Sequence, residues 1–114
     1  MIKLNNGKKW EKAGDAVDYF REMLARYSVG EKILAPQDHG DLASLLERYD
    51  SMLAPGEETK IGCGIKFFTK ENNAGENWST DGFWVTRLDG TSCDFSFRKA
   101  LAPLKNKNHD QDKK

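Results

Sequence analysis

The amino-acid sequence predicts an α+β fold, in which an antiparallel sheet is covered on one face by helices. Two segments, residues 15–28 and 39–53, repeat apolar side chains at the spacing of amphipathic helices. Strand-like alternation occurs at the N-terminus, near 61–69 and over 83–96. Two of these three segments contain Asn-Gly or Asp-Gly, the dipeptides that favour tight hairpin turns. The 114 residues suffice for one domain with its own core.

The chain opens with a predicted hairpin and then the first helix. Residues 1–4 alternate weakly, and the pair Asn6-Gly7 suits a tight turn that needs positive φ angles. Residues 8–12 would return as the second strand of this hairpin. Asp15 then suits the first turn of the helix, where a carboxylate meets unpaired N–H groups.

Each predicted helix carries one apolar stripe that we expect to face the core. Asp38 suits the N-cap of the second helix, and the connector before it should turn Ile33 and Leu34 inward. Asp41 is also expected in the first turn, and we expect Asp41 and Asp50 to follow helix capping and the solvated face of that helix. The stripes comprise Val17, Phe20, Met23, Leu24 and Tyr27 in the first helix and Leu42, Leu45, Leu46 and Tyr49 in the second.

The strand near 61–69 has one face with little side-chain volume. Gly62 and Gly64 leave that face nearly bare. Either a second element, most simply a helix, packs closely against these glycines, or a ligand does. The opposite face would carry Ile61, Cys63, Ile65 and Phe67.

Residues 70–82 form a predicted polar loop with one large apolar side chain, Trp78. An aromatic side chain in such a loop either contacts a partner or folds back onto the edge of the domain. Binding residues concentrate on loops that a rigid scaffold holds in place. Trp78 is therefore a candidate contact residue.

The hairpin over 83–96 has the clearest turn signal, Asp89-Gly90 between apolar and β-branched runs. With a two-residue loop, Trp84 lies opposite Phe95 on the face that we expect to join the core. Arg87 and Asp94 would then be diagonal neighbours on the other face, close enough to pair.

A short basic helix is predicted near 97–102, directly after this hairpin. Ser96 suits its N-cap, and Arg98 and Lys99 should project from it. Residues 1–104 thus form the predicted single domain. Residues 105–114 have no apolar anchor and predict a disordered polar C-terminal tail.

The formal charges of the chain cancel, but their distribution is uneven. Segment 14–59 carries ten acidic residues against four basic ones, whereas 97–114 carries six basic residues against two acidic ones. The zero net charge is not typical of a nucleic-acid-binding domain, which is usually strongly basic. The asymmetry suits either a charged partner or a solvated surface.

No constellation in the sequence predicts catalysis or a cofactor. The two cysteines, Cys63 and Cys93, stand in strand-like segments and indicate buried thiols in a reducing compartment. His, Cys and carboxylate residues nowhere have the spacing of metal ligands, so we expect no catalytic residue, metal site or cofactor. Without a signal sequence or a long apolar run, the chain is expected to be soluble and cytoplasmic.

Several short motifs together resemble the family named Defective in Chloroplasts and Leaves. Segment 60–65 reads Lys-Ile-Gly-Cys-Gly-Ile, which matches the family's Lys-Ile-Gly-x-Gly-Ile. Segment 94–99, after Asp-Gly at 89–90, reads Asp-Phe-Ser-Phe-Arg-Lys and is similar to the family's Asp-Phe-Ser-Tyr-Arg-Lys. The first helix and the Leu-Leu pair of the second also fit, so the resemblance covers about residues 8–104.

This resemblance implies a role connected with RNA. Plant members of the family are linked to ribosomal RNA maturation in plastids, and a similar domain ends the largest subunits of plant-specific RNA polymerases. Without a transit peptide, the chain resembles the bacterial relatives. Gly82 and Ala100 stand where members tend to have Cys, so no metal or redox role is carried over.

We expect, by this resemblance, a small non-enzymatic module that binds RNA or a ribonucleoprotein. RNA binding requires basic side chains on one face with an aromatic side chain for stacking. Alternatively, the two arginines pair with acidic neighbours, and the chain is a protein–protein interaction module that docks through the glycine face or the acidic helical half. The candidate contact residues are Lys60, Lys66, Trp78, Arg87, Arg98 and Lys99.

Overall fold

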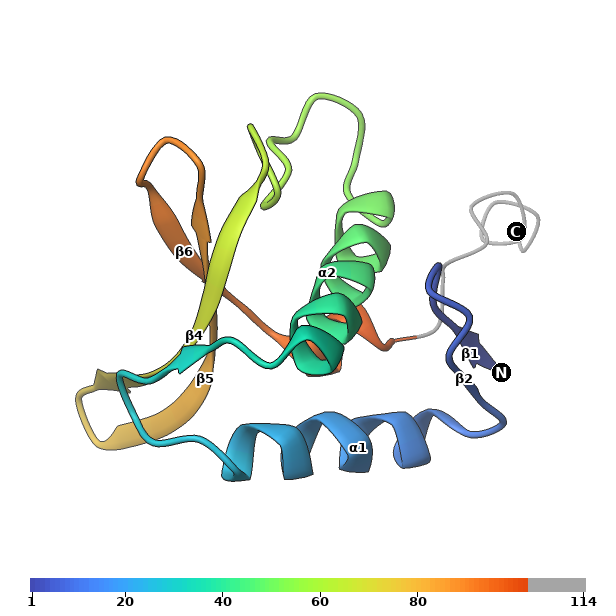
Figure 1. Cartoon of the computed structure of the whole chain (residues 1–114), viewed down its shortest axis with the longest axis horizontal. Helices are drawn as coiled ribbons and strands as arrows, with labels where there is room; N and C mark the ends of the chain where they lie inside the picture. Colours follow the sequence, from blue (N-terminus) through green and yellow to red (C-terminus); the bar gives the residue numbers. More distant parts are fainter. Residues whose placement is uncertain (103–114) are drawn as a thin grey trace.

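The computed structural model describes residues 1–102 and confirms the α+β fold (Figure 1). The main sheet is antiparallel and consists, in spatial order, of β3 (Lys32–Ile33), β4 (Ile65–Gly75), β5 (Trp78–Arg87) and β6 (Ser92–Phe95). The N-terminal hairpin forms a separate two-stranded sheet from β1 (Ile2–Lys3) and β2 (Lys9–Trp10). The helices are α1 (Ala13–Ala25), α2 (Pro36–Ser51) and α3 (Phe97–Ala100). The tail predicted over 105–114 lies outside the described residues.

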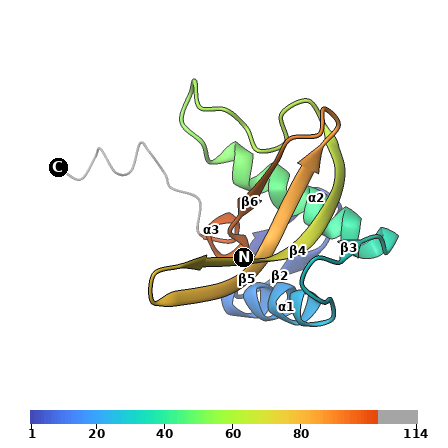
Figure 2. The same cartoon turned by 90° about the vertical axis from the view of Figure 1, so that its left-hand side faces the viewer.

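Both long helices lie on the same side of the four-stranded sheet. Figure 2 shows β4, β5 and β6 in front, with α1 and α2 behind them. The core fills the space between these layers, and the apolar stripes of the two helices supply one side of it, as predicted. Its fully shielded side chains include Phe20 and Met23 of α1, Leu42, Leu45 and Leu46 of α2, and Phe68, Phe83 and Val85 of the sheet.

The start of α2 differs from the sequence prediction in a way that matters for the fold. The helix begins at Pro36, after an extended Ala35, because a proline tolerates the first helical position. Asp38 is therefore not the N-cap but a buried residue of the first turn, 6% exposed. Its carboxylate accepts hydrogen bonds from Arg26 Nη2 at 3.0 Å and from the Tyr27 hydroxyl at 2.7 Å.

Asp41 is likewise buried rather than solvated, with 0% exposure. Its carboxylate accepts hydrogen bonds from the Tyr19 hydroxyl of α1 and from Asn6 Nδ2, the latter at 2.8 Å. The ammonium group of Lys8 lies 3.9 Å away. One carboxylate of α2 thus contacts both α1 and the N-terminal hairpin, and the expectation that Asp41 follows a solvated face is wrong.

The connector between α1 and α2 agrees with the prediction for Ile33 but not for Leu34. Ile33 points into the core with 0% exposure, whereas Leu34 is 69% exposed. The reason is that residues 32 and 33 form strand β3, which pairs with Thr69 and Phe68 of β4. Successive side chains of a strand point to opposite sides, so only one of the two can face the core.

The turn between β5 and β6 contains three residues, not two. Arg87 N–H donates to the Thr91 carbonyl at 2.7 Å, and Gly90 N–H donates to the Arg87 carbonyl at 2.9 Å. Gly90 takes a positive φ of 90°, while the Asp89 carboxylate accepts hydrogen bonds from the Thr91 N–H and hydroxyl. These hydrogen bonds hold the pKa of the Asp89 carboxyl below its usual value.

This three-residue loop shifts the strand register by one residue and reverses the faces predicted for β5. Phe83 lies opposite Phe95, and Trp84 lies opposite Asp94. Phe83 and Val85 are therefore in the core, whereas Trp84 is on the outer face of the sheet. The predicted Trp84–Phe95 pair is wrong.

The N-terminal hairpin has the same type of loop. Leu4 N–H donates to the Lys8 carbonyl at 2.8 Å, Gly7 has a φ of 94°, and the Asn6 side chain accepts from the Lys8 N–H. Within this turn, the glycine takes a positive φ and Asn6 does not. Both hairpins thus combine a turn with a left-handed glycine, the usual three-residue arrangement.

Residues 70–82 form no loop, because β4 and β5 continue through them as a long antiparallel arm. The pairs run from Lys70–Phe83 to Gly75–Trp78, and the turn falls at Glu76 and Asn77. Asn77 has a φ of 68°, which Asn adopts more readily than most residues. Trp78 therefore belongs to a strand near the tip of this arm.

Leu45→Ala should lower the free energy of unfolding by about 2–5 kcal/mol, because it opens a cavity in a fully buried site. Leu34→Ala is the matched control: the same atoms are removed from a side chain that is 69% exposed rather than 0% exposed. We expect the control to change the free energy of unfolding by less than about 0.5 kcal/mol. Urea denaturation of both variants measures the difference, and equal losses would contradict this core.

The free energy of unfolding should also fall at high pH because of two tyrosines. Burial, together with hydrogen bonds to Asp41 and Asp38, raises the pKa of Tyr19 and Tyr27 from 10.0 to about 12. A raised folded-state pKa gives a contribution that is complete below pH 10 and is lost as the pH rises through about 12. Urea denaturation across this interval measures it. The double variant Tyr19→Phe/Tyr27→Phe should show a weaker pH dependence, and an unchanged dependence would refute the assignment.

Candidate functional site

Strand β5 has a neighbour on its β6 side over only part of its length. β6 pairs with residues 83–86 of β5, and the chain leaves the sheet after Phe95. Ser96 ends the strand because its hydroxyl oxygen accepts from the Lys99 N–H at 3.1 Å and so caps α3, as predicted. Residues 78–82 of β5 therefore have no strand beside them on this edge.

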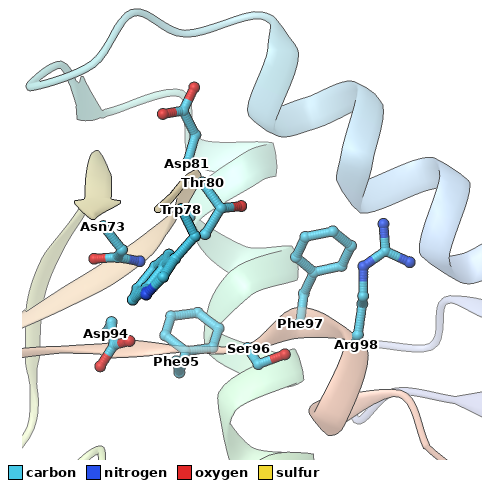
Figure 3. A pocket seen from close by; sticks show the side chains of 10 residues that line it. Asn73, Trp78, Thr80, Asp81, Asp94, Phe95, Ser96, Phe97 and Arg98 are labelled. Carbon is cyan, nitrogen blue, oxygen red and sulfur yellow. The ribbon is translucent and has the colours of Figure 1, made fainter. Parts of the chain in front are cut away.

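A hollow of about 300 Å³ lies beside this part of β5, where β6 no longer runs alongside it. In Figure 3 the Trp78 indole stands on one side and the Phe97 ring and Arg98 side chain on the other, with Phe95 and Ser96 between them. The hollow is lined by Asn73 of β4, by Trp78, Thr80, Asp81 and Gly82 of β5, and by the continuous run Asp94, Phe95, Ser96, Phe97 and Arg98.

Trp78 forms the aromatic wall of the hollow and remains 55% exposed. Its ring packs directly on the backbone of the opposite residue, because a Cβ atom on Gly75 would lie 2.2 Å from the Trp78 Nε1 atom. The glycine therefore permits the indole to lie against the arm. The ring is held in place and still presents a large apolar surface to solvent.

Arg98 forms the cationic wall. Its guanidinium carbon lies 5.3 Å from the centre of the Phe97 ring, and Phe97 itself is buried, 8% exposed. A buried aromatic ring thus supports an exposed cation through a cation–π contact. Lys99, the next residue, is also exposed on α3.

The polar groups of the hollow differ in how far they are already engaged. Asp81 accepts from Asn72 Nδ2 at 3.0 Å and lies 3.7 Å from Lys70 Nζ. Asn73 Oδ1 accepts from the Trp84 indole N–H at 3.0 Å. The exposed Asp94 carboxylate has no hydrogen-bond or ion-pair partner among residues 1–102, although the Asp94 backbone carbonyl has one.

Arg87, a predicted contact residue, has a structural role instead. Its guanidinium donates to the Lys60 carbonyl at 2.8 Å, to the Thr91 hydroxyl at 3.0 Å and to the Cys93 sulfur at 3.0 Å. Within residues 1–102 it pairs with neither Asp94 nor another carboxylate. The predicted Arg87–Asp94 pair is wrong because the register shift removes it.

The glycines at 62 and 64 explain why Arg87 is held so firmly. Residues 60–64 form a turn rather than a strand, and both glycines take positive φ angles, 54° and 128°. A Cβ atom on Gly62 would lie 2.9 Å from Arg87 Cδ, and one on Gly64 would lie 2.7 Å from Leu88 Cδ1. The side chains of the β5–β6 hairpin, and not a helix, therefore lie against these two glycines.

Two of the three predicted contact lysines, Lys60 and Lys66, do not line the hollow. Lys60 Nζ donates to the Asp94 carbonyl at 2.9 Å and lies 5.5 Å from the centre of the Tyr49 ring. Lys66 is exposed at the irregularity in β4 where the register shifts between residues 65 and 67. Of the six predicted contact residues, the structure brings Trp78 and Arg98 together, with Lys99 beside them.

The two cysteines are also less buried than predicted. Cys63 is exposed, because its segment is a turn, and Cys93 is half-buried; both are free thiols. Within residues 1–102, no three His, Cys, Asp or Glu side chains gather as metal ligands would. The same residues contain no helix that is both long enough and apolar enough to cross a membrane.

Arg48 of α2, which the sequence did not single out, binds the C-terminal end of the described chain. It donates from Nε to the Ala100 carbonyl at 2.8 Å and from Nη2 to the Ala102 carbonyl at 2.9 Å. It also lines a second hollow with Lys3. The N-terminal hairpin and the segment after α3 therefore lie at the same end of the molecule (Figure 1).

Comparison with known proteins places the chain in a family. A model of the family described as "Protein of unknown function (DUF3223)" matches residues 21–101, and the chain belongs to this family. It is similar to the solution NMR structure of an uncharacterized protein from Rhodospirillum rubrum, with a TM-score of 0.69 and 29% identity over 87% of this chain and 86% of that chain. No curated protein matches. The matched segment contains every residue that lines the first hollow.

Arg87→Ala should lower the free energy of unfolding by about 1–3 kcal/mol, because it leaves the Lys60 carbonyl without its donor. Arg98→Ala removes the same side chain from an exposed position and should change the free energy of unfolding by less than about 0.5 kcal/mol. Urea denaturation followed by tryptophan fluorescence measures both. Equal stabilities of the two variants would show that Arg87 has no structural role.

Proposed function

We propose that this member of a family of unknown function is a non-enzymatic module that binds single-stranded RNA at the hollow beside β5. The observation that carries the proposal is that Trp78 and Arg98, distant in sequence, line the same hollow. The resemblance of segment 94–99 to the family Defective in Chloroplasts and Leaves supports it, since five of these six residues line the hollow.

The two walls have complementary chemistry for an unpaired nucleotide. A base can stack on an exposed indole, which contributes about 1–3 kcal/mol per base in single-strand-binding proteins. Arg98 and Lys99 can contact the adjacent phosphate groups, because both cations are exposed on α3. Trp78 is 55% exposed and already held against Gly75, so stacking costs little ordering of the side chain.

The charge around the hollow limits the path of the RNA backbone. The arm over 70–82 carries three acidic residues against one basic residue, Lys70, so its net charge is negative and repels phosphate. Phosphates are therefore expected on the α3 side, toward the end of the molecule where Lys3 also lies. The number of phosphate contacts should be small, and the dependence of affinity on salt correspondingly modest.

A protein partner is the second candidate, and the free strand edge favours it. The Arg87 N–H donates toward β6, and alternate residues of a strand point the same way, so Ser79 and Asp81 direct backbone groups to the vacant edge. An extended segment of a partner could pair with them as an added strand. Such binding would depend on backbone hydrogen bonds rather than phosphates, and would persist at salt concentrations that dissociate RNA.

A labelled single-stranded RNA oligomer should bind the purified protein at low ionic strength and lose part of its affinity as salt rises from about 50 to about 200 mM. The double variant Arg98→Ala/Lys99→Ala should lower the slope of log K against log salt by about 1.4, or about 0.7 for each phosphate that is no longer neutralised. Trp78→Ala should weaken binding with little change in slope, since it removes stacking and no charge. Fluorescence anisotropy measures each affinity.

Lys66→Ala is the matched control for charge, because Lys66 is an exposed cation that does not line the hollow. It should leave both affinity and slope close to those of the unmodified protein. If no RNA binds at low salt, or if Lys66→Ala weakens binding as much as the double variant does, the proposed site is wrong.

A further inference from the structure

The outer face of the sheet carries one carboxylate at the hollow that nothing within residues 1–102 engages. Asp94 lies opposite Trp84 in the β5–β6 register and is exposed. Asp81, the other carboxylate of the hollow, already has Asn72 and Lys70 as partners. Asp94 is therefore the charged acceptor that remains for a ligand.

The amide of Asn73 supplies a donor close to this acceptor. The Trp84 indole N–H can only donate, so the Asn73 atom that it contacts at 3.0 Å must be the oxygen. The amide nitrogen then points away from Trp84 and lies near residue 82, where a Cβ atom would be 3.2 Å from it. Because that residue is Gly82, no side chain covers the nitrogen from the hollow.

Asp94 and Asn73 thus stand on the outer face of the sheet, on the two strands that flank β5. Asp94 lies across from Trp84 on β6, and Asn73 binds the Trp84 indole from β4. Both line the hollow that Trp78 borders. A base stacked on the Trp78 indole would present its polar edge toward these two groups.

We infer that the hollow selects a base with an exocyclic amino group, so that it binds cytosine in preference to uracil; this inference rests on the RNA-binding function proposed above. Cytosine offers the N4 amino donor beside the N3 acceptor, which match the Asp94 carboxylate and the Asn73 amide nitrogen. Uracil offers a carbonyl oxygen and an N3–H in the same places. The carbonyl oxygen would face the Asp94 carboxylate, which is also an acceptor, and N3–H would face the Asn73 amide nitrogen, which is also a donor.

Turning the uracil ring relieves only part of this mismatch. Its N3–H could then donate to Asp94 while one carbonyl oxygen accepts from Asn73, but N3–H lies between two carbonyl oxygens, and both would approach the carboxylate and repel it. Stacking on Trp78 cannot compensate, because the two pyrimidines have rings of similar size and shape. A difference in affinity between cytosine and uracil therefore measures the polar contacts rather than stacking on Trp78.

The experiment compares oligocytidine with oligouridine of equal length and label at one salt concentration, by fluorescence anisotropy. The two oligomers carry the same phosphates, so backbone contacts cancel in the ratio of their affinities. We expect the unmodified protein to bind oligocytidine about tenfold more tightly, the usual discrimination of one well-matched base contact. Asp94→Asn should bring the ratio to within about twofold, because the amide presents a donor as well as an acceptor and no charge.

Asp18→Asn is the matched control, since it removes the same charge from exposed helix α1, outside the hollow. It should retain the preference for oligocytidine. Equal binding of the two oligomers by the unmodified protein would overturn the base preference and leave RNA binding standing. Binding of neither oligomer at low salt would overturn the proposed function and this inference together, and an unchanged ratio in Asp94→Asn would show that Asp94 is not the selecting group.

Discussion

The position of α1 depends on two buried carboxylates of α2. Asp38 and Asp41 are 6% and 0% exposed, and an ionised carboxylate in such a place is costly unless hydrogen bonds and cations surround it. Tyr27 and Arg26 satisfy the first, and Tyr19, Asn6 and Lys8 approach the second. Helix α1 and the N-terminal hairpin are thus placed against α2 by specific polar contacts as well as by apolar packing. Removing one partner would leave a buried charge, so the arrangement has few alternatives.

The hollow follows from how the other end of the fold is closed. Phe95 and Phe97 both enter the core, at 4% and 8% exposure, while Ser96 between them caps α3. A strand that must turn inward after Phe95 cannot continue along β5, whose N-terminal half then has a vacant edge. Helix α3 in turn is fixed by Arg48, which binds the carbonyls of Ala100 and Ala102. The hollow is therefore a consequence of core packing, and the same packing holds its walls in place.

The sequence predicted the elements of this fold better than their register. Helical periodicity placed Phe20 and Leu45 in the core, where the structure has them, because burial of an apolar stripe is decided locally. The Asp89-Gly90 turn was recognised, but the dipeptide is compatible with both two- and three-residue loops. In the three-residue loop adopted here, only Gly90 takes a positive φ and the Asp89 side chain accepts from Thr91. Because the loop is one residue longer than predicted, Phe83 rather than Trp84 lies in the core.

The predicted basic residues do not gather on one face, and the cause is related to the register shift. The prediction of Arg87 as a free cation assumed that Gly62 and Gly64 belong to a strand. These glycines instead form a turn with positive φ angles, and the Arg87 side chain packs over them and donates to the Lys60 carbonyl. The packing of Arg87 over this turn joins residues that are distant in sequence, so no local pattern signals it. What remains at the hollow is one supported cation, Arg98, and one carboxylate, Asp94, that no residue within 1–102 engages. A site with so little net charge must obtain its specificity from shape, stacking and hydrogen bonds rather than from phosphate attraction.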